Sequence, residues 1–249
     1  MKNKLVLAGI ISCFTTCIGC TLDGQQIDKK PVGFWQFEEV SGTQINDSSG
    51  NDNKGTISKD MLNVKRIAGR TGSALEFSLK NKKSGSVVLA DFAKKYKFFS
   101  TGITIEAWIK PSNNFKRESI YEIVSNAESD RGKGFRLIIS WGTLSFKSGE
   151  GGAVGKTWGA SSKASAHVLK PEVWYHVAGV FDGAVFCVYI DGELVGQTEP
   201  GQVLTAGRKD VYIGSYANGY AYGFDGVIDE VKIYDYPRTS VQILEDAKK

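Results

Sequence analysis

The chain has 249 residues, of which 41% are hydrophobic and 23% are charged, so it can bury one large core or two smaller ones and does not have the composition of a disordered protein. Its 29 glycines, 11% aromatic residues and only 5 prolines favour short strands joined by tight turns over a helical bundle or a collagen-like repeat. The net charge of +4 falls to +2 without Lys2 and Lys4 of a leader, which gives no reason to expect nucleic acid as a partner.

The N-terminus has the pattern of a cleaved leader. Two lysines precede the apolar run Leu5 to Phe14, which is about half as long as a membrane-spanning helix and therefore favours a signal peptide. The segment Cys17-Ile18-Gly19-Cys20 resembles the lipobox of bacterial lipoproteins, although Cys17 stands where leucine is usual. This resemblance implies that residues 1–19 are removed and that Cys20 is acylated. The alternative is an ordinary secretory signal that leaves Cys20 as a thiol.

The resemblance also implies a location. Thr21 rather than aspartate follows Cys20, which by analogy with known sorting signals favours the outer membrane of a bacterial envelope, on its periplasmic or its surface face. We expect residues 20–30 to form a flexible tether and residues 31–249 to form the folded domain. Cys187 is the only cysteine of that domain, so no disulfide is available within it, and its apolar neighbours predict a small buried side chain.

Alternating polarity predicts strands along the body of the chain. In Ile103 to Ile109 every second residue is apolar, and Pro111 ends the run, which is typical of a strand with one buried face. The runs Phe135 to Ser140 and Thr143 to Lys147 flank Trp141-Gly142 and predict a hairpin.

The second half of the chain continues this pattern. Three predicted strands, Val173 to Phe181, Val185 to Ile190 and Leu194 to Thr198, are joined by Asp182-Gly183 and Asp191-Gly192, dipeptides that favour the positive backbone angles of tight hairpins. Two more strands are predicted at Val211 to Gly214 and Phe224 to Tyr234, and a helix only at Ser240 to Lys248. Strands without helical crossovers predict one all-β sandwich of two antiparallel sheets with a short C-terminal helical tail.

Several sequence blocks resemble those of one known family. They start at GFWQFEE (33–39) and continue with GRTGSALEF (69–77), ITIEAWIKP (103–111), WYHVAGVFDG (174–183), YIDGEL (189–194) and FDGVIDEVKIY (224–234). Their order and spacing over about residues 31–245 are similar to those of laminin-G-like jelly-roll domains of the concanavalin A-like lectin/glucanase superfamily. The resemblance implies one convex and one concave sheet. It leaves the ligand open, because this fold hosts lectins, hydrolases and adhesion modules.

Carboxylates near the two ends of the domain are candidates for a structural calcium site. Alternation in residues 227–233 places Asp229 on the apolar face, where a carboxylate needs a partner. Glu39 is expected to share a strand face with Trp35 and Phe37, and the next turn is rich in the oxygen ligands that calcium prefers.

Related jelly-roll families hold calcium where the first and last strands meet. By resemblance, the ligands here are Glu39 and Asp229, with Glu38 and Asp47 as alternates. The alternative is that Asp229 and Glu39 accept hydrogen bonds from backbone amides or from Trp35, and that Asp47 only caps a turn.

Catalysis has little support in the sequence. Glucanases of this superfamily carry closely spaced acids on one strand, but no Glu-x-Asp-x-x-Glu pattern occurs here. Glu118 and Glu122 share a strand face, as do Glu128 and Asp130, yet their polar surroundings predict solvated loops. His176 lies in a Trp-x-His block that matches the family, and we expect it to have a structural role.

The sequence supports ligand binding better than catalysis. Tyrosines gather in a glycine-rich stretch, and glycine disfavours a regular strand interior. Amphipathic rings beside amide donors fit sugars, and they fit protein surfaces equally; for any single ring, packing inside the sandwich is the alternative. The candidate ligand-binding residues are Tyr216, Asn218, Tyr220, Tyr222, Trp141 and Trp158.

These features predict a non-enzymatic, lipid-anchored envelope protein whose jelly-roll domain binds glycan or a glycosylated surface partner. Two alternatives stay open. One is a glycoside hydrolase or lyase that uses an acid pair among Glu118, Glu122, Glu128 and Asp130. The other is a structural or adhesion subunit that recognises protein.

Overall fold

The computed structural model describes residues 29–58, 63–79, 84–96, 98–150, 156–161, 169–216 and 222–249. The strands are β1 (Gly33–Trp35), β2 (Gln44–Ile45), β3 (Gly55–Ile57), β4 (Val64–Ala68), β5 (Ser73–Phe77), β6 (Val87–Leu89), β7 (Ile103–Pro111), β8 (Ile120–Ser125), β9 (Phe135–Ser140), β10 (Thr143–Gly149), β11 (Thr157–Ser161), β12 (Tyr175–Phe181), β13 (Phe186–Ile190), β14 (Glu193–Gln197), β15 (Val211–Ile213) and β16 (Gly226–Tyr234). The helices are α1 (Phe92–Lys95), α2 (Phe98–Thr101) and α3 (Ser240–Ala247).

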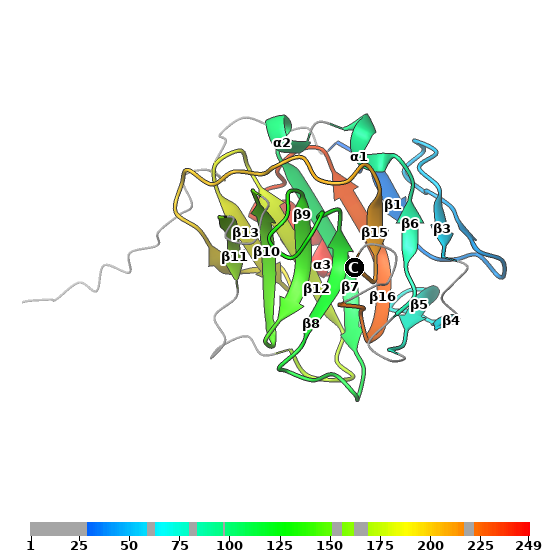
Figure 1. Ribbon diagram of the computed structural model, residues 1–249. Coiled ribbons are helices and arrows are strands. Elements are labelled where there is room, and N and C mark those ends of the chain that lie inside the picture. The colour runs from blue at the N-terminus through cyan, green and yellow to red at the C-terminus, as the bar shows by residue number, and fades with distance from the viewer. Residues whose placement is uncertain are drawn as a thin grey trace, which may run out of the picture.

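The strands form two antiparallel sheets packed face to face (Figure 1). The first sheet has the order β14-β13-β12-β7-β16-β5-β4, with β1 paired to β16, and the second has the order β11-β10-β9-β8-β15-β6-β3-β2. The predicted all-β sandwich with a C-terminal helix is therefore confirmed. Within the described residues, no helix is long and apolar enough to cross a membrane.

The core lies between the sheets and follows the predicted alternation. Ile105 and Ile109 of β7 are fully buried in it, as are Leu137 and Ile139 of β9. Burial of each such side chain stabilises the fold by about 1.5–3 kcal/mol. Cys187 is also buried, but on the outer face of the first sheet, among residues that pack under α3.

The hairpin turns use the predicted residues in two ways. Trp141 and Gly142 both have positive φ angles of 53° and 77°, and Asp191 and Gly192 have φ angles of 51° and 82°, as a two-residue turn of this type requires. At Asp182-Gly183 only the glycine has a positive φ. There the Asp182 carboxylate accepts hydrogen bonds from the amides of Ala184 and Val185 instead.

A bulge in β16 changes the predicted position of Asp229. Ile228 pairs with Ile109 and Ile233 pairs with Ile105, so β16 has one more residue than β7 between these pairs, and Glu230 takes a positive φ of 47°. Asp229 consequently pairs with Trp108 on the outer face of the sheet. The prediction that Asp229 faces the core is wrong, because an extra residue in a strand shifts the alternation of its faces.

Asp229 is nevertheless fully buried, because the turn between β4 and β5 lies over it. The amides of Arg70 and Thr71 donate to its Oδ2 over 2.8 and 3.3 Å, and the amide of Glu230 donates to Oδ1 over 2.8 Å. A Cβ atom on Gly69 would lie 2.5 Å from Oδ2, so the close approach of the turn requires glycine. Burial raises the pKa of Asp229 to about 7, and the three N–H groups lower it only in part.

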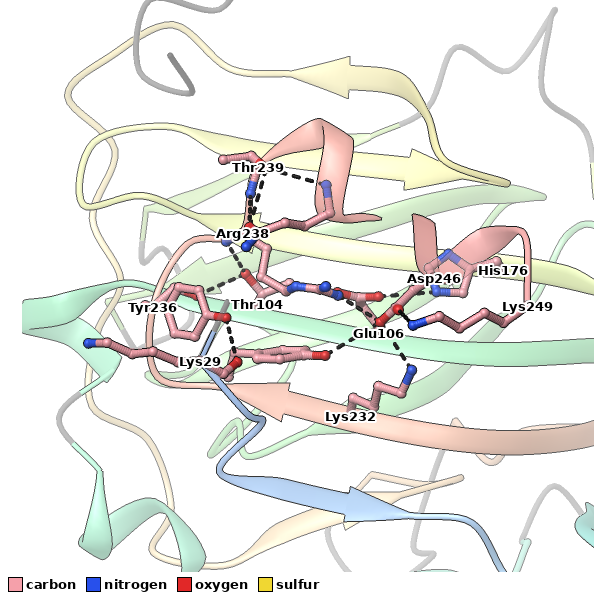
Figure 2. A network of polar contacts seen from close by, with 12 residues as sticks. Lys29, Thr104, Glu106, His176, Lys232, Tyr236, Arg238, Thr239, Asp246 and Lys249 are labelled. Carbon is pink, nitrogen blue, oxygen red and sulfur yellow. Dashed lines mark hydrogen bonds and ion pairs between the residues drawn. The ribbon is translucent and has the colours of Figure 1, made fainter. Parts of the chain in front are cut away.

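Helix α3 covers a buried ion network on the outer face of the first sheet (Figure 2). Arg238 is buried, and its Nη1 donates to Glu106 Oε1 over 2.5 Å and to Asp246 Oδ2 over 2.8 Å. His176 Nε2 lies 3.2 Å from Glu106 Oε2, and Lys232 Nζ lies 3.0 Å from Asp246. Four elements, β7, β12, β16 and α3, are joined in this way.

The start of α3 is fixed by its cap. The Thr239 hydroxyl accepts from the Gln242 amide, and the Gln242 side chain accepts from the Thr239 amide over 2.9 Å, which is a capping box. Ile243 then points into the cluster formed by β12 and β13.

The variant Arg238→Ala is expected to lower the free energy of unfolding by about 3–5 kcal/mol, because it leaves the buried carboxylates of Glu106 and Asp246 without this partner. Urea unfolding followed by tryptophan fluorescence measures the change. Lys249→Ala is the control, because it removes an exposed partner of Asp246 and should change stability by less than about 1 kcal/mol. Equal effects of the two variants would contradict this account of the network.

Stability is also expected to depend on the titration of Asp229. The pKa of Asp229 is higher in the folded chain, at about 7, than in the unfolded chain, at about 4. The protonated carboxyl therefore stabilises the fold below pH 4, and this contribution is lost as the pH rises through 7. Between these pH values the wild type should lose about 2–4 kcal/mol relative to Asp229→Asn. Urea midpoints of both proteins across this range check the result, and a difference that does not change with pH would count against it.

Candidate functional site

Part of the predicted set lies outside the described residues. This applies to Cys20, Asn218 and Tyr220, and to the side chain of Trp158, whose backbone belongs to β11. The other candidates are all placed, and they fall in three different regions of the sandwich.

The four predicted calcium ligands all accept hydrogen bonds from backbone amides. Glu39 accepts from Asn46 over 2.7 Å, and Glu38 accepts from Ser73 over 3.1 Å. Asp47 accepts from three amides, each over 2.9 Å, and in this way holds its own turn against β1. Asp229 accepts hydrogen bonds from the amides of the turn between β4 and β5, as described above.

These side chains do not converge on one point. Within the described residues, no three His, Cys, Asp or Glu side chains lie close enough together to hold a metal ion. The expected strand face of Trp35, Phe37 and Glu39 is also interrupted, because β1 ends at Trp35 and Phe37 has a φ of 60°. The geometry matches the alternative of backbone hydrogen bonding, and calcium binding stays a prediction.

Two of the candidate acids, Glu122 and Asp130, form ion pairs with an arginine. Arg136 of β9 and Glu122 of β8 are buried on the outer face of the second sheet, and Arg136 Nε donates to Glu122 over 2.7 Å. Arg136 Nη1 also pairs with Asp130. Burial lowers the pKa of Arg136, but Glu122 and Asp130 outweigh this cost and raise it above its usual range. The prediction that Glu122 lies in a solvated loop is wrong, whereas Glu118 and Glu128 are exposed.

Arg136 supports the aromatic residues of the predicted binding cluster. The rings of Tyr216 and Tyr222 are half-buried, lie 6.1 Å apart in an edge-to-face arrangement and sit 5.8 and 5.3 Å from the Arg136 guanidinium. The Tyr216 hydroxyl donates to the carbonyl of Glu128. The structure therefore brings these two tyrosines together, with a buried cation beneath them that fixes their position. Sequence reasoning missed Arg136, whose only signal is a charged residue in an apolar strand.

Tyr222 also lines a pocket that has a volume of about 860 Å³. Its lining includes the connection between β7 and β8, which lies at the end of the sandwich opposite α1 and α2 (Figure 1). Four segments line it: the end of β5, residues 112–121, Trp141 and residues 222–226. This volume is within the range of small-molecule sites.

Aromatic residues contribute to the lining of this end pocket. Trp141 stands at the tip of the β9–β10 hairpin with 63% of its surface exposed, whereas Tyr121 is buried in the wall. The loop beside them is held in place, because the amide of Lys116 donates to the Tyr121 hydroxyl over 2.7 Å and the amide of Trp141 donates to the Ser119 carbonyl over 3.2 Å. A large exposed ring on a fixed backbone is typical of a binding surface.

Polar residues complete the end pocket. Glu76, Glu118 and Asp225 contribute carboxylates, Lys116 an ammonium group and Asn114 an amide. The arrangement can hold a ligand that has an apolar face and several hydrogen-bonding groups. His176 is not part of this pocket, because it is buried under α3 against Glu106 and Trp108.

Comparison with known structures gives the same fold. Domain 4 of AbnA, a GH43 extracellular arabinanase from Geobacillus stearothermophilus in complex with arabinotriose, matches with a TM-score of 0.65 and 20% identity over 88% of this chain and 98% of that chain. The binding domain of botulinum neurotoxin DC in complex with rat synaptotagmin II matches with a TM-score of 0.67 and 14% identity over 88% of this chain, which spans 51% of the toxin domain. The same toxin domain in complex with SialylT gives a TM-score of 0.63 and 15% identity, with coverage of 88% and 51%.

No curated protein matches the sequence. A family model does match, over residues 81–244, which is about two thirds of the chain and includes β6 to β16. Together with the two-sheet sandwich, this match confirms the resemblance of the sequence blocks. The chain belongs to the concanavalin A-like lectin/glucanases superfamily.

Proposed function

We propose that this domain binds carbohydrate in the end pocket and does not cleave it. The observation that carries the proposal is the exposed ring of Trp141 in the lining of the pocket, together with Tyr121 and Tyr222. A sugar ring has an apolar face and a rim of hydroxyl groups. The aromatic side chains fit the apolar face, and the carboxylates and amide of the pocket fit the hydroxyl groups.

The structural relatives support this proposal. The arabinanase domain is in complex with arabinotriose, and the toxin domain is in complex with SialylT. The toxin domain is also in complex with synaptotagmin II, which keeps a protein partner as the alternative.

The proposal that the domain does not cleave its ligand is supported by two of the four acids that were candidates for catalysis. Glu122 has no exposed surface and is paired with Arg136, so it is not placed to meet a substrate. Asp130 is paired with the same guanidinium. These two acids have a clear structural role, which is to hold the arginine beneath Tyr216 and Tyr222.

We further propose that the domain is displayed on a bacterial envelope through lipid on Cys20, with residues 20–30 as the tether. The support is the leader sequence, with its short apolar run and the Cys17 to Cys20 segment. A domain that binds glycan at one end of a sandwich is well suited to presentation on a flexible tether.

Trp141→Ala is expected to weaken glycan binding about tenfold or more, because it removes the exposed ring that lines the pocket. A glycan array identifies a ligand, and calorimetry measures its affinity. Trp174→Ala is the matched control, since Trp174 does not line the pocket and its loss should leave the affinity unchanged. A polysaccharide-degradation assay runs beside it, and release of product would favour the hydrolase alternative. Equal affinity of both variants would contradict the assignment of the pocket.

Metabolic labelling with a fatty acid tests the anchor. The full chain expressed in a bacterial host is expected to incorporate the label and to sediment with membranes, whereas Cys20→Ala should do neither. Cys13→Ala, within the leader, serves as the control and should keep the label. Label retained by Cys20→Ala would contradict lipidation at this residue.

A further inference from the structure

The end pocket is lined by a carboxylate that has no hydrogen-bond partner among the residues that the structure describes. Asp225 lines the pocket and is only 7% exposed. Among the described residues no donor lies within hydrogen-bonding distance of its carboxylate, and only its backbone carbonyl is engaged, by the amide of Ser112. The oxygens of this carboxylate are not among the fully buried, unpartnered polar atoms of the described residues, so they are open to the pocket and can accept hydrogen bonds from a ligand.

Other buried or half-buried carboxyl groups of the domain do have partners within the protein. Asp229, Asp47, Glu122 and Asp246 each accept hydrogen bonds from backbone amides or from a cation. The conformation at Asp225 is fixed as well, because the next residue, Gly226, begins β16 and pairs with both Phe77 and Pro111. The backbone that carries Asp225 is therefore held in place beside the cavity.

The charge of the pocket indicates which groups it accepts. Glu76 and Glu118 line it together with Asp225, and Lys116 is the one cationic side chain among its described lining residues. Carboxylates only accept hydrogen bonds when ionised, so they need donors from the ligand. A donor that also carries positive charge gains the most, because a charge-assisted hydrogen bond is stronger than a neutral one. A ligand carboxylate would be repelled.

We propose that the end pocket selects glycans that carry a free amino group, and that Asp225 is the residue that determines this specificity. The inference rests on the proposed carbohydrate binding and names its substrate class. The ammonium group of an unacetylated amino sugar would donate to Asp225, while its ring lies against the aromatic residues of the pocket. Acetylation removes the charge of the amine, and a sugar acid reverses it, so both should bind more weakly.

Three oligosaccharides of the same length and linkage test the inference, with an amino, an acetamido or a hydroxyl group at carbon 2 of each sugar. Calorimetry is done on the full chain with a chelator present, at a mildly acidic pH that keeps the amine charged. We expect the amino form to bind about tenfold to a hundredfold more tightly than the other two. This preference should shrink as salt is added, because salt screens charges that are open to solvent.

Asp225→Asn keeps the shape of the side chain and removes its charge. We expect it to abolish the preference for the amino form over the hydroxyl form and not to lower the urea midpoint. The control Asp235→Asn changes a carboxylate outside the pocket and should keep the preference.

Equal affinity for all three sugars, or an amine preference that survives in Asp225→Asn, would overturn the inference while leaving glycan binding intact. Tight binding of a neutral glycan from the array together with no binding of the amino form would also overturn it. If no glycan on the whole array binds, the result would instead contradict the proposed function itself.

Discussion

The fold depends on the pairing of β7 with β16, which joins segments more than a hundred residues apart in the centre of the first sheet. These strands carry charged residues on their outer face as well as apolar residues on their inner face. Glu106 would be unpaired and buried if Arg238 and His176 did not meet it beneath α3. Pairing of the strands and docking of the helix therefore stabilise each other, because neither surface is satisfied alone.

The second sheet also buries an ion pair on its outer face, and this pair supports two aromatic rings. Arg136 and Glu122 are buried on its outer face, and the rings of Tyr216 and Tyr222 cover the guanidinium. One of these rings continues into the wall of the end pocket. The ion pair thus links the scaffold to the proposed ligand surface, and it fixes a tyrosine in a segment that regular strand pairing does not hold. Asp225 has no such partner among the residues that the structure describes, and we propose that a ligand supplies one.

The alternation of apolar residues predicted most of the strands. It also predicted the faces of β7, because every second side chain of a regular strand points to the same face of the sheet. It failed at Asp229, where one extra residue in β16 exchanges the two faces, and hydrophobicity alone does not reveal a bulge. The prediction of Trp141 at a hairpin tip was confirmed, since Trp141-Gly142 forms the turn directly. The buried role of Glu122 and the pocket position of Asp225 were not predictable, because both depend on segments distant in sequence.

The central claim is that a glycan ring lies against Trp141 in the end pocket. The five tryptophans of the chain give five indole N–H signals in a nitrogen-proton NMR spectrum, and each can be assigned by single substitution. Titration with a glycan identified on the array should move the Trp141 signal first and most, and should leave the signals of the buried Trp35 and of Trp174 nearly unchanged. Saturable binding that leaves the Trp141 signal in place would contradict the account.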